Sequence, residues 1–138
     1  MGSPVDVNGR SFEFVDQENT AGSFVVDVPG GLQSKRELLE TLATAGQFPD
    51  YFGCNWDALL DCLSDFGWIE ERRIVIRHAD LPSRHSLEDC RTYLQILGES
   101  VRYWARAAGQ PTAEHVMQPS HELRVVFPSS AREEHSSI

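Results

Sequence analysis

Three short apolar runs, separated by stretches with helical periodicity, constrain the fold of this 138-residue chain more than any other feature. The runs lie at residues 24–28, 72–77 and 123–127 and are rich in β-branched and aromatic residues, as buried strands are. Strands that alternate with helices along a chain usually form a parallel sheet. We therefore predict an α/β fold with a small three-stranded parallel sheet packed with helices.

Capping residues and apolar spacing predict a helix in each gap between the strands and a further helix in the first gap. Ser34 and Glu37 have the capping-box spacing, and Gly46 is placed to end this first helix. The second helix follows Asn55, a favourable N-cap residue, and the third follows Ser86. The third helix has an apolar stripe that we expect in the core: Leu87, Cys90, Leu94, Leu97, Val101, Trp104 and Ala108.

The two ends of the chain lie outside this pattern. Apolar residues alternate on either side of Asn8-Gly9, a dipeptide that favours a type I′ turn, which predicts a β-hairpin over residues 5–15. The length fits one domain, and 41% hydrophobic residues suffice for a modest core. We expect an N-terminal extension at 1–22, the main domain at 23–128 and a mobile tail at 129–138.

The net charge of −9 is concentrated in one half of the chain. Residues 1–70 carry 12 acidic and 3 basic residues, whereas residues 71–138 carry 9 of each. This charge disfavours nucleic-acid phosphates and anionic membranes and favours a basic protein partner. No segment approaches the roughly 18–20 apolar residues of a membrane span or has signal-peptide form, so a cytoplasmic protein is expected.

An aromatic and glycine-containing loop that leads into the second helix, at residues 48–66, has the most unusual pattern. Asp57, Asp61 and Asp65 are four residues apart, which places three like charges on one helix face at a cost of a few tenths of a kcal/mol per pair. The apolar residues of this helix recur on roughly the opposite face: Trp56, Leu59, Leu60 and Leu63. We call these three aspartates the acidic ridge. Because their mutual repulsion destabilises the helix, we expect the ridge to bind a positively charged group.

This segment resembles the barstar family of intracellular ribonuclease inhibitors. The matching motifs are Pro49-Asp-Tyr-Phe-Gly53, Asn55-x-Asp57-Ala-Leu59 and Asp61-Cys-Leu63, with strand and helix before them and strand, helix and strand after them. The resemblance implies a surface, made by the loop and the second helix, that blocks the active site of a small guanyl-type bacterial ribonuclease. It also implies a monomer that forms a 1:1 complex with this target.

Individual roles follow from the same resemblance. It implies that Asp61 occupies the phosphate-binding pocket of the enzyme, that Asp57 and Tyr51 flank it, and that Ser64 supplies a hydroxyl contact. Leu60 and Phe66 stand where the best-known member has tryptophans. The residues expected to bind the ribonuclease are Tyr51, Gly53, Asn55, Asp57, Leu60, Asp61, Ser64 and Asp65.

Other interpretations of these residues remain open. The scaffold could serve as an immunity module against a different basic toxin. Asp57 and Asp61 offer oxygen ligands for Mg²⁺ or Ca²⁺, although no further His or Asp cluster accompanies them. A thiol enzyme would use Cys54 or Cys62 with one of His78, His85, His115 or His121 as the base. The three cysteines, which include Cys90, are odd in number and lack C-x-x-C spacing, so we expect reduced thiols. None of the cysteines or histidines lies in a recognisable nucleophile motif, so we expect no catalysis, and we expect no cofactor and no metal.

Overall fold

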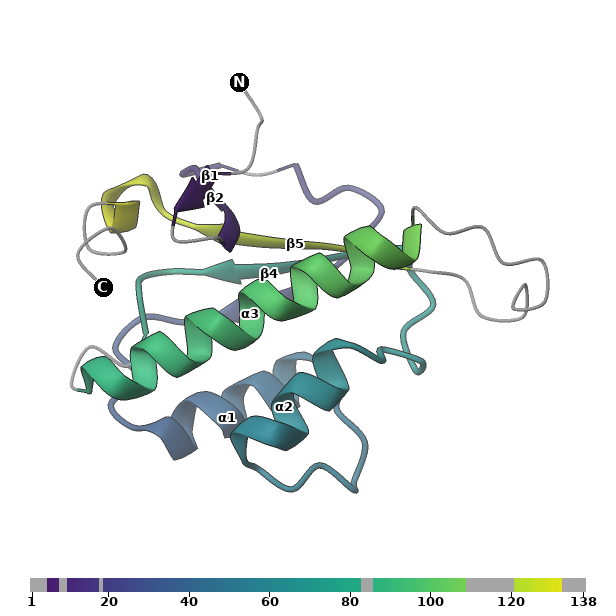
Figure 1. The fold of residues 1–138 in the computed structure, drawn as a ribbon, viewed down its shortest axis with the longest axis horizontal. Helices are drawn as coiled ribbons and strands as arrows, with labels where there is room; N and C mark the ends of the chain where they lie inside the picture. The colour runs from purple at the N-terminus through teal and green to yellow at the C-terminus, as the bar shows by residue number, and fades with distance from the viewer. Residues whose placement is uncertain (1–4, 8–9, 18, 83–85, 109–120, 133–138) are drawn as a thin grey trace.

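The computed structural model describes residues 5–7, 10–17, 19–82, 86–108 and 121–132 (Figure 1). These residues form strands, three α-helices and a short 3-10 helix. The elements in chain order are β1 (Val5–Val7), β2 (Arg10–Phe14), β3 (Ser23–Val28), α1 (Lys35–Ala45), α2 (Trp56–Leu63), β4 (Arg73–His78), α3 (Leu87–Ala108), β5 (Glu122–Phe127) and the 3-10 helix (Ser129–Ala131). The predicted order of strands and helices after residue 22 is confirmed.

The sheet has one more parallel strand than predicted. Its order is β1-β2-β5-β4-β3, and the four strands β2, β5, β4 and β3 run parallel to one another. The additional parallel strand is β2, which pairs with the outer edge of β5 through Glu13 and Phe14. β1 pairs antiparallel with β2, but the predicted turn at Asn8-Gly9 lies outside the described residues.

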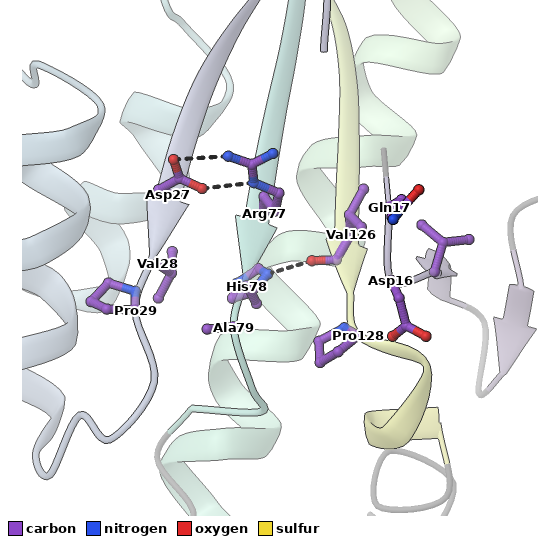
Figure 2. A pocket seen from close by; sticks show the side chains of 11 residues that line it. Asp16, Gln17, Asp27, Val28, Pro29, Arg77, His78, Ala79, Val126 and Pro128 are labelled. Carbon is purple, nitrogen blue, oxygen red and sulfur yellow. Dashed lines mark hydrogen bonds and ion pairs between the residues drawn. The ribbon is translucent and has the colours of Figure 1, made fainter. Parts of the chain in front are cut away.

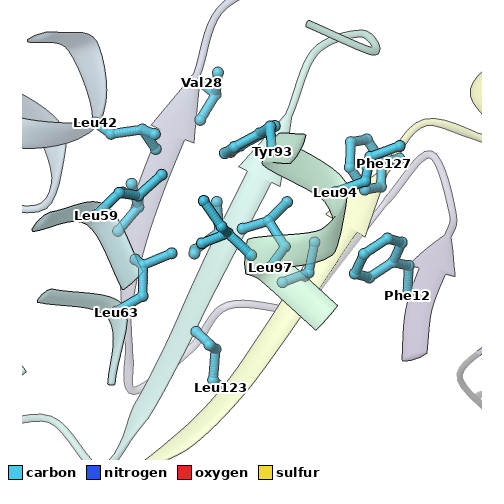
Figure 3. Close-up of a cluster of buried hydrophobic side chains, with 14 of the residues drawn as sticks. Phe12, Val28, Leu42, Leu59, Leu63, Tyr93, Leu94, Leu97, Leu123 and Phe127 are labelled. Carbon is cyan, nitrogen blue, oxygen red and sulfur yellow. The ribbon is translucent and has the colours of Figure 1, made fainter. Parts of the chain in front are cut away.

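The core lies between the three helices and one face of this sheet. Side chains alternate between the two faces of a strand, and on each of the four parallel strands those of one alternating set join a single apolar cluster with the helices. Figure 3 shows part of this cluster, with leucines from all three helices opposite strand residues. Its members from β2, Phe12 and Phe14, have their ring centroids 5.5 and 5.8 Å from that of Phe127 on β5.

In many parallel sheets, helices cover both faces. In this sheet, the face opposite the helices carries charged side chains instead. Asp27 and Arg77 are direct neighbours in the register of β3 and β4, and two hydrogen bonds of 2.8 and 3.1 Å join them. Arg124 on β5 forms a similar pair with Glu13 on β2. Opposite charges therefore join the strands across this face.

The helix boundaries follow the predicted caps, but one residue of the predicted core stripe of α3 is exposed. The Ser34 hydroxyl accepts a hydrogen bond from the Glu37 amide at 3.1 Å, and α1 ends before Gly46. Gly46 has a φ of −88°, however, and the left-handed conformation falls on Gln47, with a φ of 55°. On α3, Leu87 is 51% exposed, so its predicted place in the core is wrong.

The predicted stripe is confirmed at Cys90, Leu94, Leu97, Val101 and Trp104, which lie in the core or against it. Leu87 differs because it is the first residue of the helix and lies beyond the edge of the core. The first residues after β5 form the 3-10 helix, where Ser129 donates from its amide and hydroxyl to Asp16. None of the helices in the described part of the chain is long and apolar enough to span a membrane.

Candidate functional site

The loop before α2 is shaped by the N-cap of the helix. The Asn55 side-chain oxygen accepts a hydrogen bond from the Ala58 amide at 2.8 Å, as the sequence predicted, and its side-chain nitrogen donates to the Gly53 carbonyl at 3.4 Å. A Cβ atom on Gly53 would lie 3.1 Å from that nitrogen, so glycine leaves room for the cap. The left-handed residue of the loop is Cys54, with a φ of 55°.

One face of α2 anchors the helix in the molecule. Leu59 and Leu63 are fully buried, and Cys62 is 2% exposed. Trp56 is half-buried against Tyr93 of α3, with ring centroids 6.4 Å apart. This anchoring leaves the opposite face of the helix exposed and fixes its orientation.

The acidic ridge is shorter than the sequence predicted. Asp57 and Asp61 are exposed on α2, but the helix ends at Leu63, so Asp65 lies in the turn that follows it. The turn forms because Phe66 takes a φ of 48° and enters the core, where it is fully buried. The Asp65 carboxylate accepts a hydrogen bond from the Gly67 amide at 3.2 Å, which gives it a structural role.

Tyr51, in the loop before α2, lies beside the acidic surface of the helix. Its side chain is 70% exposed, and its hydroxyl lies 3.5 Å from the Asp65 carboxylate. Desolvation and the charge of Asp65 both raise the pKa of Tyr51, so the phenol keeps its proton and stays a donor. The structure therefore brings the predicted tyrosine, 14 residues before Asp65, to the far end of the helix.

An open hollow of about 600 Å³ lies between α2 and α3. Leu60 and Asp61 of α2 line it with Ser64, which follows the helix, and Glu99, Tyr103 and Arg106 are among the residues that line it from α3. These α3 residues were not predicted from the sequence. Their spacing of four and three does mark one polar helix face, but only the packed structure shows that this face meets α2.

A second hollow, of about 770 Å³, lies at the carboxyl ends of β3, β4 and β5 (Figure 2). Its charged groups already have partners within the chain, because Arg77 pairs with Asp27 and Asp16 accepts from Ser129. The hydrogen bond to the Asp27 carboxylate raises the pKa of Arg77. The hydrogen bonds from the amide and hydroxyl of Ser129 lower the pKa of Asp16. None of the eight residues predicted to bind a ribonuclease lines this hollow.

Among the described residues, Cys62, His78 and His121 have surroundings that do not suit a nucleophile and its base. Burial, followed by the charges of Asp65 and Asp61, raises the pKa of Cys62 to about 11, which keeps its thiol protonated at neutral pH. Both ring nitrogens of His78 and of His121 are occupied by Tyr93 or backbone carbonyls. His85 and His115 lie outside the described residues.

The three cysteines are free thiols in the structure. Within the described part of the chain, no three or more His, Cys, Asp or Glu side chains gather in a way that could hold a metal ion.

The chain is thus a small α/β domain in which a packed helix presents an exposed acidic face beside an exposed tyrosine and an open hollow. The chain belongs to the Barstar (barnase inhibitor) family, whose model matches residues 24–116. The resemblance seen in the sequence is thereby confirmed, and at the level of the family the chain is an inhibitor of barnase-type ribonucleases and not an enzyme. A search of curated proteins gave no significant match.

Proposed function

We propose that this chain blocks the active site of a small guanyl-type bacterial ribonuclease with the exposed surface of α2 and its loop. The inhibitor acts as a monomer that binds one enzyme molecule, in the cytoplasm of the cell that makes the enzyme. The observation that carries this proposal is Asp61, an exposed carboxylate on a rigidly packed helix, which has no ion-pair partner among the described residues.

The mechanism is steric and electrostatic. A ribonuclease holds a substrate phosphate with cationic side chains, and a carboxylate in the same place forms charge-assisted hydrogen bonds with them. Asp61 takes that place, and Asp57 and Tyr51 contact the enzyme on either side. Ser64 and Leu60 add a hydroxyl and an apolar contact from the wall of the hollow.

The remaining predicted residues have mainly supporting roles in this proposal. Gly53 and Asn55 shape the loop through the N-cap, and Asp65 lies beside the Tyr51 hydroxyl. Because their polar atoms are already engaged within the chain, their replacement acts on binding through the position of Tyr51 and α2.

The charge distribution supports fast association with a basic enzyme. The excess of nine acidic residues in the first half includes the charges of α2 and its loop. Such a field raises association rates by roughly one to three orders of magnitude at low salt, a range that measurements on the barnase–barstar pair itself helped to establish. We expect association to slow as salt increases.

Titration of the purified chain into a barnase activity assay tests the proposal. Loss of RNA cleavage with an endpoint at one inhibitor per enzyme is the expected result. Asp61→Asn should weaken inhibition by roughly 2–5 kcal/mol, a range taken from measurements that include this family's own complexes. Asp89→Asn, on the first turn of α3, is the matched control and should change it little. Equal inhibition by both variants would contradict this block of the active site by Asp61, which we call the plug.

A second candidate is an immunity module that neutralises a different basic toxin. The observation that favours it is Leu60, which lines the hollow where the resemblance leads us to expect the larger tryptophan. A smaller apolar contact fits a different target surface. Under this alternative, the chain would protect against a basic toxin without inhibiting guanyl-type ribonucleases, which a parallel titration of both kinds of protein distinguishes.

A further inference from the structure

The hollow between α2 and α3 is lined by charges of both signs, with Asp61 on the α2 side and Glu99, Arg102 and Arg106 on the α3 side. Asp61 lines it from α2, and Arg106 lines it from the last turn of α3. Both residues are exposed, and no ion pair joins them to each other or to another of the described residues. Two opposite charges that share a hollow without pairing are both available to an incoming surface.

Two other side chains that line this hollow suit a protein partner. Tyr103 is 43% exposed on the α3 wall, and Leu60 is half-buried on the α2 wall. Aromatic and apolar groups of this kind are enriched in protein interfaces, and the charges around them set the orientation of the partner. A uniformly basic surface would meet Asp61 favourably but would bring a like charge against Arg106.

We propose that the hollow recognises a protein surface of mixed charge, in which a cation meets Asp61 and a carboxylate meets Arg106. The proposal rests on the proposed function, since the partner is taken to be the ribonuclease that α2 blocks. It adds that this enzyme carries an acidic side chain at the rim of its basic active site. Arg106 is thus a specificity-determining residue, because it repels enzymes whose rim is basic at that point.

Arg106 also has an ordinary structural role to be separated from recognition. A basic side chain in the last turn of a helix interacts favourably with the helix dipole. Replacement with glutamine removes both effects, so the melting temperature of each variant must be measured beside its inhibition. A purely structural role would lower the melting temperature without changing inhibition by the folded protein.

The test uses the ribonuclease that the full chain inhibits, with barnase as the first probe, and compares Arg106→Gln, Arg106→Glu and Asp61→Asn. Arg36→Glu on α1 is the control, because Arg36 has a side chain that is 81% exposed, lies outside the hollow, and gives the same change in net charge. We expect Arg106→Glu to weaken inhibition at least about tenfold, Arg106→Gln to weaken it less, and Arg36→Glu to change it less than about threefold. A charge-reversal scan of acidic residues on the ribonuclease should then find one position that restores binding of Arg106→Glu.

The outcomes separate this inference from the proposed plug. If Arg106→Glu inhibits as well as the unmodified chain or better while Asp61→Asn is weakened, the mixed-charge surface is wrong and the plug stands. If no acidic position on the enzyme restores Arg106→Glu, the carboxylate opposite Arg106 is likewise wrong. If the unmodified chain inhibits no ribonuclease, the plug fails and the mixed-charge inference fails with it.

Discussion

At the scale of single residues, His78 shows how a buried polar group is built into the core. Its Nδ1 lies 3.0 Å from the Val126 carbonyl, which can only accept, so this nitrogen carries the proton. Its Nε2 then accepts from the Tyr93 hydroxyl at 2.7 Å, and its ring stacks on Phe127 at 4.2 Å. Burial lowers the pKa of His78 from 6.5 to about 4, so the folded protein holds the ring neutral.

This environment predicts a loss of stability in mild acid. Between pH 6.5 and about 4 the unfolded chain protonates His78 and the folded protein does not. The stabilising contribution is therefore complete above pH 6.5 and decreases as the pH falls, by up to about 3 kcal/mol. Urea unfolding at several pH values measures it, with His78→Phe as the comparison. The variant should be less stable at pH 7 but lose stability less steeply between pH 6.5 and 4, and parallel profiles would contradict the prediction.

The exposed positions of Asp57, Asp61 and Tyr51 could be predicted from the sequence because they depend on local features: helical spacing and a polar loop. The left-handed conformations of Cys54 and Phe66 could not. Neither residue type signals a positive φ, and each adopts it because neighbouring packing requires it: Phe66 reaches the core, and Cys54 precedes the capped end of α2.

At the scale of elements, α2 is a helix of only eight residues and owes its stability to its cap and its buried face. Its first residue could be predicted because Asn55 is a local signal. Its last could not, because the four-residue spacing of the aspartates continues to Asp65 although the backbone leaves the helix after Leu63. Core packing of Phe66, a tertiary effect, overrides the spacing.

The cap of α2 gives a prediction that separates stability from binding. Asn55→Ala removes the acceptor of the Ala58 amide and should lower the free energy of unfolding by about 1 kcal/mol. Asn55→Asp keeps an acceptor oxygen and should remain within a few tenths of a kcal/mol of the unmodified chain. Chemical denaturation measures both. An equal loss in the two variants would show that the side-chain nitrogen, which donates to Gly53, matters more than the cap.

At the scale of the whole molecule, the sheet extends beyond the segment that carries the family resemblance. The family match begins at residue 24, yet Phe12 and Phe14 of β2 lie in the main core. The parallel order of β3, β4 and β5 could be predicted because strands and helices alternate along the chain. The pairing of Glu13 with Val126 could not, since it joins segments more than a hundred residues apart and no local pattern marks it.

The place of β2 in the core predicts that residues before the family match stabilise the fold. Phe12 is fully buried and packs edge-on against Phe127, so Phe12→Ala should lower the free energy of unfolding by about 3–5 kcal/mol. Phe24→Ala on β3 is the matched control and should cost less, because Phe24 is only half-buried. Urea unfolding measures both.

Since β2 packs against α3 and β5, and neither Phe12 nor Phe14 lines the α2 hollow, the folded fraction of Phe12→Ala should inhibit the ribonuclease like the unmodified chain. A smaller loss for Phe12→Ala than for Phe24→Ala would mean that β2 adds little to the core, and weaker inhibition per folded molecule would mean that it also positions the binding surface.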